Sequence, residues 1–287
     1  MTDGVVVVDK PSGMTSHDVV DEVRRRLNTR KVGHAGTLDP DATGVLVLGV
    51  GRATRLLSYV SASDKSYRAA AIFGTTTTTQ DASGEVVQRR DASGLARADV
   101  EAALGSFVGD IEQIPPMVSA VKVGGERLYR KARRGEVVER AARRVTIHGV
   151  ELVDFRAGQE PVATLEVHCS AGTYVRTLVF DLGETLRCGA HLAALRRLEA
   201  GGFSEAEAVA LGDVGAQRLR PLTDVVRALP QLEADEDAAR GVAHGRPLAG
   251  DGGVAEGRPV AVVRNGALLA VYVRRGRALV AERVLSS

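Results

Sequence analysis

One carboxylate lies in a segment whose composition disfavours regular secondary structure. Asp39 stands between Gly33 and Gly44, in a stretch that contains three glycines, and Pro40 follows it directly. Glycine permits backbone angles that other residues avoid, and a proline disfavours the helical conformation of the residue before it. We therefore expect Asp39 on a tight, irregular loop, with a buried strand at residues 45–49 after it. Loops held by buried strands often carry catalytic residues, but an Asp-Pro pair is also typical of an ordinary turn.

An arginine and a tyrosine are the other side chains whose positions suggest chemistry. Apolar residues at helical spacing over 175–186 predict a helix that has Arg176 near its start and Gly189 as its stop signal. A cation is unfavourable at that end of the helix dipole unless a carboxylate or a phosphate lies beside it. Tyr67 falls on a predicted strand at residues 65–74. The loop carboxylate, the oddly placed cation and the strand tyrosine are therefore the candidate catalytic groups.

Basic residues gather in two segments, although the chain as a whole is close to neutral. The formal net charge is +2, from 38 Lys and Arg against 36 Asp and Glu. The clusters lie at residues 24–31 and 127–144, and the second holds eight basic residues against Glu136 and Glu139. We expect much of this second segment to be exposed helix, which fits either RNA phosphates or a solvated helix face. With 3% aromatic residues and no Trp, a long platform for stacked bases is not expected.

Other catalytic and metal-binding patterns are weak or missing in the sequence. Cys188 and His191 have the spacing of half a zinc site, and His168 and Cys169 are adjacent. Strand alternation over residues 162–169 directs Cys169 to the apolar face and His168 to the other face, so we expect buried free thiols rather than a metal site. The sequence has neither a nucleophile elbow nor a P-loop, and its one glycine pair after a strand lacks the rest of a dinucleotide-binding loop.

Strand and helix signals divide the chain into a large part and a small part. A buried strand is expected at residues 5–9, and a helix with a capping box at Thr15 follows it. Near the end of the chain, short strands and an Asn-Gly hairpin signal at residues 265–266 predict a β-rich unit. We therefore predict domains at residues 1–229 and 230–287. No apolar run reaches the length of a membrane span and no signal peptide is visible, so we expect a cytoplasmic protein without membrane contact.

Several segments resemble the motifs of bacterial TruB-type tRNA pseudouridine synthases, in the same order along the chain. The loop around Asp39 is similar to the family signature G-H-x-G-x-L-D-P-x-A-x-G. Further segments that resemble family motifs are residues 8–16, 64–67, 113–135, 169–178 and 188–198. The resemblance covers about residues 5 to 200, and on this basis the chain is identified as a member of the family.

The resemblance implies a role for each matching side chain. Asp39 matches the essential aspartate, which helps break the glycosidic bond by attacking C1′ or by removing a C2′ proton. Arg176 matches the arginine that pairs with this aspartate and keeps it ionised. Tyr67 matches a tyrosine that stacks on the target base and accepts the C5 proton directly or through water. Leu195 matches an apolar contact to the base, and His34 matches a histidine that helps hold the flipped-out nucleotide. Basic residues that we expect to contact the RNA are Lys10, Lys65, Lys122, Arg127 and Arg130.

The resemblance also implies a fold and a reaction. The fold is α+β, with a mixed, mostly antiparallel central sheet and flanking helices, plus a small β-rich PUA-like C-terminal domain as in actinobacterial members. The reaction is isomerisation of uridine-55 in the T-loop of tRNA to pseudouridine, by a monomer that binds the T-arm. No metal, nucleotide or redox cofactor is needed, because the product is an isomer of the substrate.

One alternative function and two departures from the family pattern accompany the resemblance. A non-catalytic RNA-binding or tRNA-folding module on the same scaffold is the alternative function. Thr78 stands where the family often has Asp, and Val118 stands where an aromatic residue is common. The glycines around Asp39 are expected to let a flipped ribose approach the backbone closely.

Overall fold

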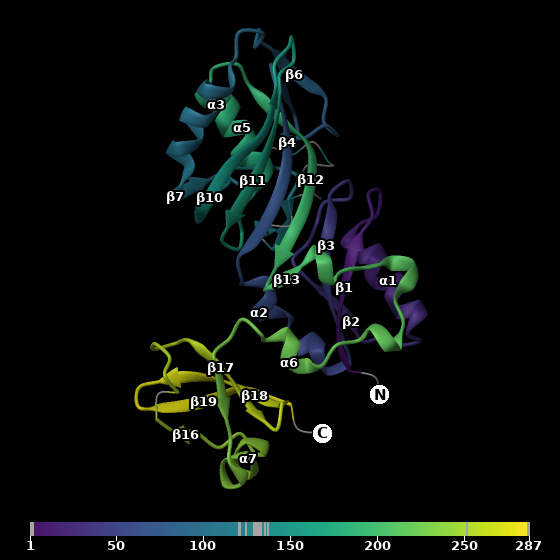
Figure 1. Ribbon diagram of the computed structural model, residues 1–287, viewed down its shortest axis with the longest axis vertical. Helices are drawn as coiled ribbons and strands as arrows, with labels where there is room; N and C mark the ends of the chain where they lie inside the picture. Colours follow the sequence, from purple (N-terminus) through teal and green to yellow (C-terminus); the bar gives the residue numbers. More distant parts are fainter. Residues whose placement is uncertain are drawn as a thin grey trace.

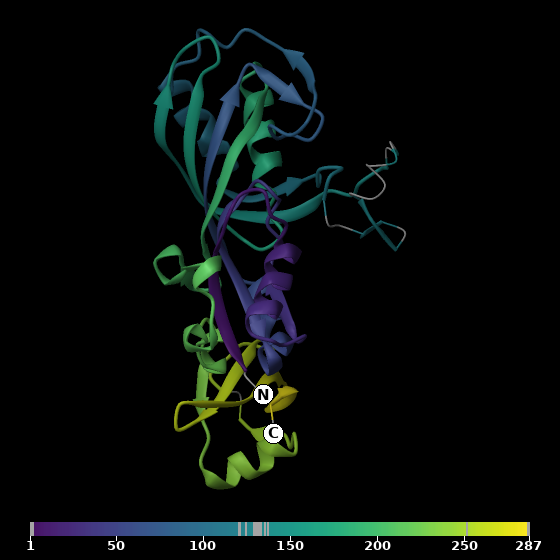
Figure 2. The ribbon, with the colours of Figure 1, turned by 90° about the vertical axis from the view of Figure 1, so that its right-hand side faces the viewer.

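The computed structural model describes residues 3–119, 122–123, 125–128, 134, 136, 138–250 and 252–285, with the backbone alone for residues 122, 123 and 127. Figure 1 shows a large twisted sheet with helices packed against it, and a small sheet at the lower end of the molecule. The perpendicular view in Figure 2 shows the same order along an elongated molecule. No helix among the described residues is long and apolar enough to cross a membrane.

The large sheet is mixed and mostly antiparallel, which confirms the predicted fold class. Among the described residues it has ten strands, and its main path runs β14-β1-β3-β12-β4-β11-β10-β7. Only the β1–β14 and β3–β12 pairs of this sheet are parallel. Its strands are β1 (Gly4–Lys10), β2 (Val32–Ala35), β3 (Thr43–Val50), β4 (Lys65–Phe73), β7 (Gly109–Gln113), β10 (Arg143–Arg156), β11 (Val162–Cys169), β12 (Ala190–Ala200), β13 (Phe203–Ser204) and β14 (Val209–Ala210). Two small hairpins are formed by β5 (Thr75–Thr77) with β6 (Val86–Arg89) and by β8 (Lys122–Val123) with β9 (Glu126–Arg127).

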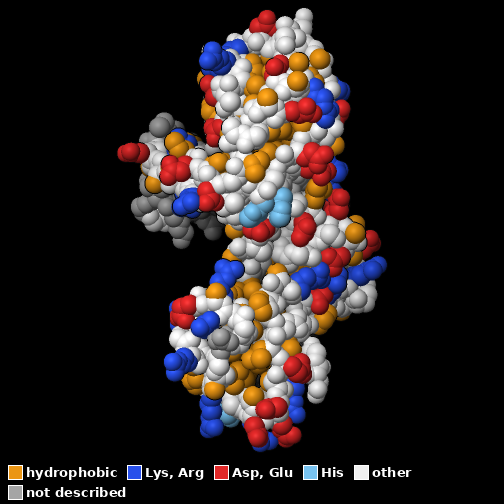
Figure 3. All heavy atoms as spheres, turned by 60° about the vertical axis from the view of Figure 1, so that its left-hand side comes forward, with side chains coloured by type: hydrophobic (Ala, Val, Ile, Leu, Met, Phe, Trp, Pro, Cys, Tyr) orange, Lys and Arg blue, Asp and Glu red, His pale blue; other side chains and the backbone are white. Residues whose placement is uncertain are grey.

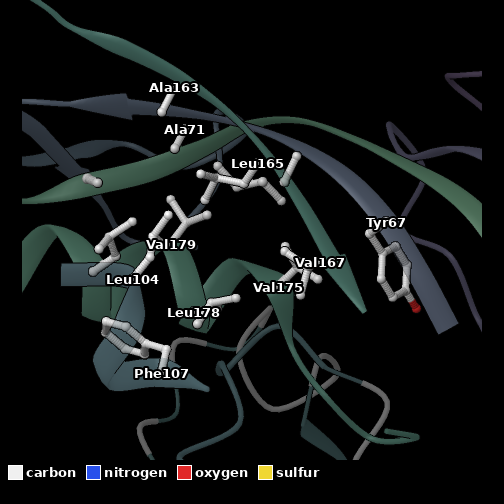
Figure 4. Close-up of a cluster of buried hydrophobic side chains, with 14 of the residues drawn as sticks. Tyr67, Ala71, Leu104, Phe107, Ala163, Leu165, Val167, Val175, Leu178 and Val179 are labelled. Carbon is white, nitrogen blue, oxygen red and sulfur yellow. The ribbon is translucent and has the colours of Figure 1, made fainter. Parts of the chain in front are cut away.

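Helices α3 (Arg97–Leu104) and α5 (Val175–Thr185) cover one face of the sheet at β4, β10, β11 and β12 (Figure 1). Burial along β4 alternates, so that Tyr67, Ala69, Ala71 and Phe73 all face this core. Figure 4 shows Tyr67 at the border of the cluster, beside Val167. The alternation that builds the core therefore also brings Tyr67 to the edge of the site described below.

Helix α1 (Ser16–Arg26) supports β1 and β3 from the other side of the site. The predicted capping box is confirmed: the Asp18 amide donates to Thr15 Oγ1 at 3.1 Å, and the Thr15 amide donates to Asp18 Oδ2 at 2.8 Å. The apolar face of the helix, with Val19, Val20 and Val23, packs against buried residues of the two strands. This packing fixes the end of β1 and the turn that follows it.

The basic segment at residues 127–144 does not form the helix that we expected at its end. Arg143 and Arg144 begin β10 and pair with Gln113 and Glu112 of β7. The reason is the alternation that follows: Val145 and Ile147 point into the core, which a strand satisfies and a helix would not. The charge count that suggested an exposed helix face carried no information about this period-2 pattern.

The last part of the chain forms a five-stranded sheet of its own. The Asn-Gly signal is confirmed, because Asn265 and Gly266 adopt φ angles of 49° and 75° between β17 and β18. An apolar cluster that includes Leu56, Val226 and Val271 joins this sheet to the rest of the chain. The domain boundary near residue 230 stays a prediction. The strands here are β15 (Gln231–Glu233), β16 (Leu248–Ala249), β17 (Pro259–Arg264), β18 (Ala267–Arg275) and β19 (Ala278–Val284), and the remaining helices are α2 (Leu57–Ser61), α6 (Leu222–Val225) and α7 (Glu236–Ala243).

Candidate active site

Asp39 lies on an irregular loop between the paired strands β2 and β3, as its sequence context predicted. The loop is tied to the protein on both sides of the carboxylate. Ser16 Oγ accepts from the Leu38 amide at 2.9 Å and donates to the Leu38 carbonyl at 3.1 Å. The Lys10 ammonium donates to the Pro40 carbonyl at 2.8 Å. These bonds hold the backbone of Asp39 while its side chain remains 45% exposed.

Lys10 and Lys65, which we predicted to contact RNA, both lie inside the framework of the site. Lys10 is fully buried, and its ammonium donates to the carbonyls of Pro11, Met14 and Pro40. Lys65 is 6% exposed and donates to the carbonyl of Ser61 at 2.9 Å, and to two others of the preceding turn. Burial lowers the pKa of Lys65 to about 8. In this structure both ammonium groups therefore bind the protein's own backbone.

Gly44 has a different purpose from the one that we expected for the glycines around Asp39. Gly44 adopts a φ of +97°, and a Cβ atom there would lie 2.2 Å from the carbonyl oxygen of Arg197 on β12. The space beside Gly44 is thus filled by the backbone of a neighbouring strand, and the prediction that it admits a ribose is wrong for this glycine. The glycine instead lets β3 and β12 meet, which closes the sheet beneath Asp39.

Arg176 connects the Asp39 loop to the turn that follows β5. Its guanidinium is 5% exposed, and its two terminal nitrogens bind different partners. Nη2 lies 3.2 Å from Asp39 Oδ2 and donates to the Val118 carbonyl at 2.8 Å. Nη1 donates to Asp81 Oδ2 at 3.0 Å and to the Thr79 carbonyl at 3.3 Å. The carboxylates explain why an arginine is tolerated in the first turn of α5.

The two carboxylates that share Arg176 have opposite pKa shifts. For Asp39, burial raises the pKa of the carboxyl above its usual value; Arg176 counteracts this only in part, and the negative charge of Asp81 adds to the rise. For Asp81, burial acts in the same direction, but hydrogen bonds from Ser83 and Thr79 outweigh it and lower the pKa. Asp81 is therefore fully engaged by donors, whereas Asp39 keeps an open carboxylate edge.

A pocket of about 260 Å³ opens beside Asp39. Tyr67 forms one wall and Leu195 of β12 another, and Arg176 reaches it from α5. The remaining lining residues are Gly36, Thr37, Leu38, Ser61, Lys65, Ser119, Gly172, Thr173, Tyr174, Val175 and Arg197. Asp39 also lines this pocket. Four predicted site residues therefore converge on one cavity together with Lys65, namely Asp39, Tyr67, Arg176 and Leu195.

The other predicted site residues do not line this pocket. His34 is half-buried on β2, opposite Leu48 of β3 and five residues before Asp39. Lys10 lies beneath the loop and supports it. For Lys122 and Arg127 the structure gives the backbone of the β8–β9 hairpin, and Arg130 lies outside the described residues. Their contacts to RNA stay predictions.

Sequence reasoning missed two residues of the site, Asp81 and Arg197. Asp81 has no feature in its local sequence that singles it out, and 95 residues separate it from Arg176. Arg197 is 1% exposed, and it donates to the carbonyls of Val45 at 2.7 Å and Gly36 at 3.1 Å. No alternation in the sequence marked Arg197, because its second neighbours on β12 are the half-buried Leu195 and the exposed Glu199. Its role depends on the backbone carbonyls that the fold brings to it, since a buried arginine must find several acceptors.

The part of the chain that the structure describes brings no metal-ligand set together. Cys169 and Cys188 are free and buried. His168 points to the opposite, exposed side of β11, where its ring lies 4.9 Å from that of His148, and His148 Nε2 lies 3.2 Å from Asp64. Figure 3 shows a histidine patch on one face of the molecule. Among the described residues, no group of three or more His, Cys, Asp or Glu side chains is arranged to hold a metal ion.

Two family sequence models match adjoining parts of the chain. The TruB family pseudouridylate synthase N-terminal domain matches residues 24–175, and the tRNA pseudouridylate synthase B C-terminal domain matches residues 176–229. A tRNA pseudouridine synthase B of Symbiobacterium thermophilum is 55% identical over 245 residues, which cover 85% of this chain and 82% of the relative. One of Thermobifida fusca is 48% identical over 259 residues, which cover 88% of each. The chain belongs to the TruB family of pseudouridylate synthases.

Solved structures share the fold of this TruB-family chain over 99% of its length. A Cbf5–Nop10–Gar1 complex gives a TM-score of 0.79 at 27% identity, over 85% of that chain. An H/ACA RNP bound to a substrate RNA containing 2′-deoxyuridine gives a TM-score of 0.77 at 24% identity, also over 85% of that chain, and here the likeness is one of fold alone. Because nearly the whole chain is matched, the likeness includes the small C-terminal sheet.

Two arginines of the basic segment of this TruB-family chain, Arg134 and Arg144, are paired with carboxylates. Arg134 donates to both oxygens of Glu126 and to Glu136, and Arg144 lies 2.6 Å from Asp110 of β7. Two of these acids lie outside the segment in sequence, so the charge count overlooked them. These pairs are exposed, and RNA phosphates can exchange for their carboxylates at small cost.

Proposed function

We propose that this TruB-family enzyme converts uridine-55 in the T-loop of tRNA to pseudouridine, with Asp39 as the catalytic carboxylate. The observation that carries the proposal is the placement of Asp39 at an open pocket. There the carboxylate lies 3.2 Å from the buried cation of Arg176, with Tyr67 and Leu195 as walls. The sequence relatives named tRNA pseudouridine synthase B support the substrate class.

The chemistry begins at the C1′–N1 bond of the target nucleotide. Its electron pair leaves with the uracil, so the sugar becomes electron-poor, as in glycoside hydrolysis. Asp39 either forms a bond to C1′ or takes a proton from C2′, and both routes require its carboxylate in the ionised form. Arg176 favours that form and orients the carboxylate, because Val118, Thr79 and Asp81 fix the guanidinium. The detached uracil then turns and joins C1′ through C5. In the same step the Asp39–C1′ bond breaks, or in the other route Asp39 returns the proton to C2′, and the C5 proton then leaves.

Tyr67 and Leu195 are proposed to hold the detached base between them. The apolar Leu195 side chain and the aromatic ring of Tyr67 let a flat base turn without a fixed hydrogen bond. Burial raises the pKa of the Tyr67 hydroxyl, so the phenol stays protonated near neutral pH. Such a phenol accepts the C5 proton only by passing its own proton on. We therefore propose that Tyr67 works as a relay to water.

Access to the sugar requires the uridine to leave the folded T-loop. Base flipping costs the stacking of the base, which RNA contacts outside the pocket must offset. We propose His34, Lys122, Arg127 and Arg130 for such contacts, and a PUA-like domain at residues 230–287, beside a catalytic domain at 1–229, as a further RNA-binding surface. All side chains proposed for the site come from one chain, which supports action as a monomer. A tRNA substrate favours action in the cytoplasm.

Release of tritium from T-arm RNA that carries [5-³H]uridine at position 55 tests this proposal. We expect tritium release in proportion to pseudouridine formed, without added metal or cofactor. A T-arm with cytidine-55 and tritiated uridine elsewhere is the matched control and should release none. If the protein bound the T-arm tightly but released no tritium from uridine-55, the non-catalytic RNA-binding function would replace the proposed one.

A further inference from the structure

A buried hydroxyl in the pocket has no hydrogen-bond partner among the residues that the structure describes. Ser119 is 5% exposed and lines the pocket of Asp39, and its Oγ atom is buried without a hydrogen bond. Buried polar atoms in proteins are nearly always hydrogen-bonded, so an orphaned atom indicates a group that arrives later, such as a ligand or water. No sequence signal had singled out this serine as a site residue.

The chain around Ser119 is held in place by the catalytic elements themselves. The Val118 carbonyl accepts from Arg176 at 2.8 Å, immediately before the serine. A few residues earlier, the Gln113 side chain accepts from the Tyr174 amide at 2.9 Å and donates to the Tyr174 carbonyl at 3.2 Å. Two attachments to the start of α5 therefore fix the segment that presents the hydroxyl to the pocket. The guanidinium that pairs with Asp39 thus also orients Ser119.

The position of Ser119 fits the base of a nucleotide better than its phosphate. The cations that line the pocket, Lys65, Arg176 and Arg197, already bind acceptors of the protein. A phosphate would therefore lose its hydration there without a cation to replace it. Uracil is flat and has two carbonyl oxygens, O2 and O4, which accept hydrogen bonds. When uracil turns about the axis through N3 and C6, N1 and C5 exchange places, and so do O2 and O4. One hydroxyl can therefore meet a carbonyl oxygen before and after the turn.

We propose that Ser119 Oγ donates a hydrogen bond to a carbonyl oxygen of the target uracil, and so stabilises the base after it detaches from the sugar. This proposal rests on the proposed function. The electron pair of the broken C1′–N1 bond leaves the uracil negatively charged, and the charge spreads onto O2 and O4. A donor at that position is worth more to the detached base than to the bound nucleotide. A hydroxyl suits this task because it rotates freely and carries no charge that would fix the base.

Single-turnover rates and affinities for T-arm RNA test the proposal with wild type, Ser119→Ala and Ser119→Thr. We expect Ser119→Ala to slow pseudouridine formation by about tenfold or more and to change the dissociation constant by less than about twofold. Ser119→Thr keeps the hydroxyl and should recover much of the rate. Ser106→Ala is the matched control, since Ser106 is exposed after α3 and donates only to the Ala103 carbonyl; it should behave as wild type.

RNA with sulfur in place of O2 or O4 of uridine-55 supplies a readout that a structural role would not change. Sulfur is a poor acceptor, so at least one thio-RNA should react more slowly with wild type, and Ser119→Ala should remove that difference. The proposal would be overturned by a Ser119→Ala rate equal to that of wild type. It would also be overturned by equal thio effects in both proteins. An inactive wild type would instead overturn the proposed function, and this inference with it.

Discussion

The loop of Asp39 and the turn of Asp81 bring two carboxylates to the same guanidinium. The two carboxylates differ in their hydrogen-bond donors and in their exposure. Asp81 accepts from Thr79, from the Ser83 hydroxyl and from the Ser83 amide, as well as from Arg176. Asp39 has the longer contact to Arg176 and a side chain that is 45% exposed to the pocket, against 20% for Asp81. One carboxylate is thus saturated with donors, and the other is oriented but left open.

This difference separates a reacting group from a group that positions another. A carboxylate with four donors is a weak nucleophile and a weak base, because attack or proton transfer would break those hydrogen bonds. A carboxylate with one cation beside it keeps lone pairs for the reaction, and Arg176 favours its ionised form against the effect of burial. The Asp81 charge also raises the pKa of Asp39. Asp81 therefore affects Asp39 in two ways, by sharing Arg176 and by direct electrostatic repulsion.

The distinction between a reacting Asp39 and a positioning Asp81 would fail most clearly if Asp39 were dispensable. We predict that Asp39→Asn lowers the single-turnover rate by at least about 10⁴-fold, because the amide can neither attack C1′ nor accept the C2′ proton. Affinity for T-arm RNA, measured by filter binding, should change by less than about threefold. Equal loss of rate and affinity would instead make Asp39 a structural residue of the loop.

A weaker but still large effect is expected at the shared cation. Arg176→Lys should lower the rate by roughly 10² to 10³-fold, because one ammonium cannot serve Asp39 and Asp81 at once. Lysine is chosen because alanine would remove the donor that Asp39, Asp81 and the carbonyls of Val118 and Thr79 share. Single-turnover assays with thermal denaturation separate chemistry from folding. A lysine variant as fast as wild type would refute the proposed bridging role.

Removal of the Asp81 charge should have a smaller effect on rate. Asp81→Asn keeps acceptor capacity toward Ser83 and Thr79, so the turn should persist and the rate near neutral pH should fall by about tenfold or less. Asp39→Asn and Asp81→Asn measured together give the asymmetry directly. If the two variants lost activity equally, the distinction between an open and a saturated carboxylate would be wrong.

The contribution of Lys10 to the Asp39 loop should appear in the free energy of unfolding rather than in the affinity for RNA. Lys10→Met removes a buried ammonium that donates to three carbonyls, and we predict that the free energy of unfolding in urea falls by about 3 kcal/mol. Arg68→Met is the matched control, because Arg68 pairs with Glu166 on the exposed face of the sheet and should cost less than about 1 kcal/mol. Equal losses in the two variants would contradict the role of Lys10.

The local parts of this architecture could be predicted from the sequence. Period-2 alternation predicted β11 with Cys169 inward and His168 outward, the capping box fixed the start of α1, and the Asn-Gly pair predicted the β17–β18 hairpin. The irregular loop of Asp39 followed from glycine and proline. These features depend on residues a few positions apart, so a single sequence contains the information.

The remaining features depend on residues that only the tertiary fold brings together. In the sequence, Asp81 resembles an ordinary turn residue. In the fold, Arg176 of α5 donates to its carboxylate. In the sequence, Gly44 suggests space for a substrate, but in the fold the backbone of β12 occupies that space. In the sequence, the basic segment has few acids near it, but in the fold Asp110 of β7 pairs with its Arg144. In each case a partner from a distant segment decides the role, and spacing along the chain does not identify that partner.

The pH dependence of the single-turnover rate, compared between wild type and Asp81→Asn, tests the central claim most directly. The reaction needs ionised Asp39, so the rate of the wild type should fall as the pH drops through the raised pKa of that carboxyl. Without the Asp81 charge, and with Arg176 left to Asp39 alone, that pKa should fall and the acid limb should move to lower pH. An acid limb that stays in place, with both proteins folded across the range, would contradict the account.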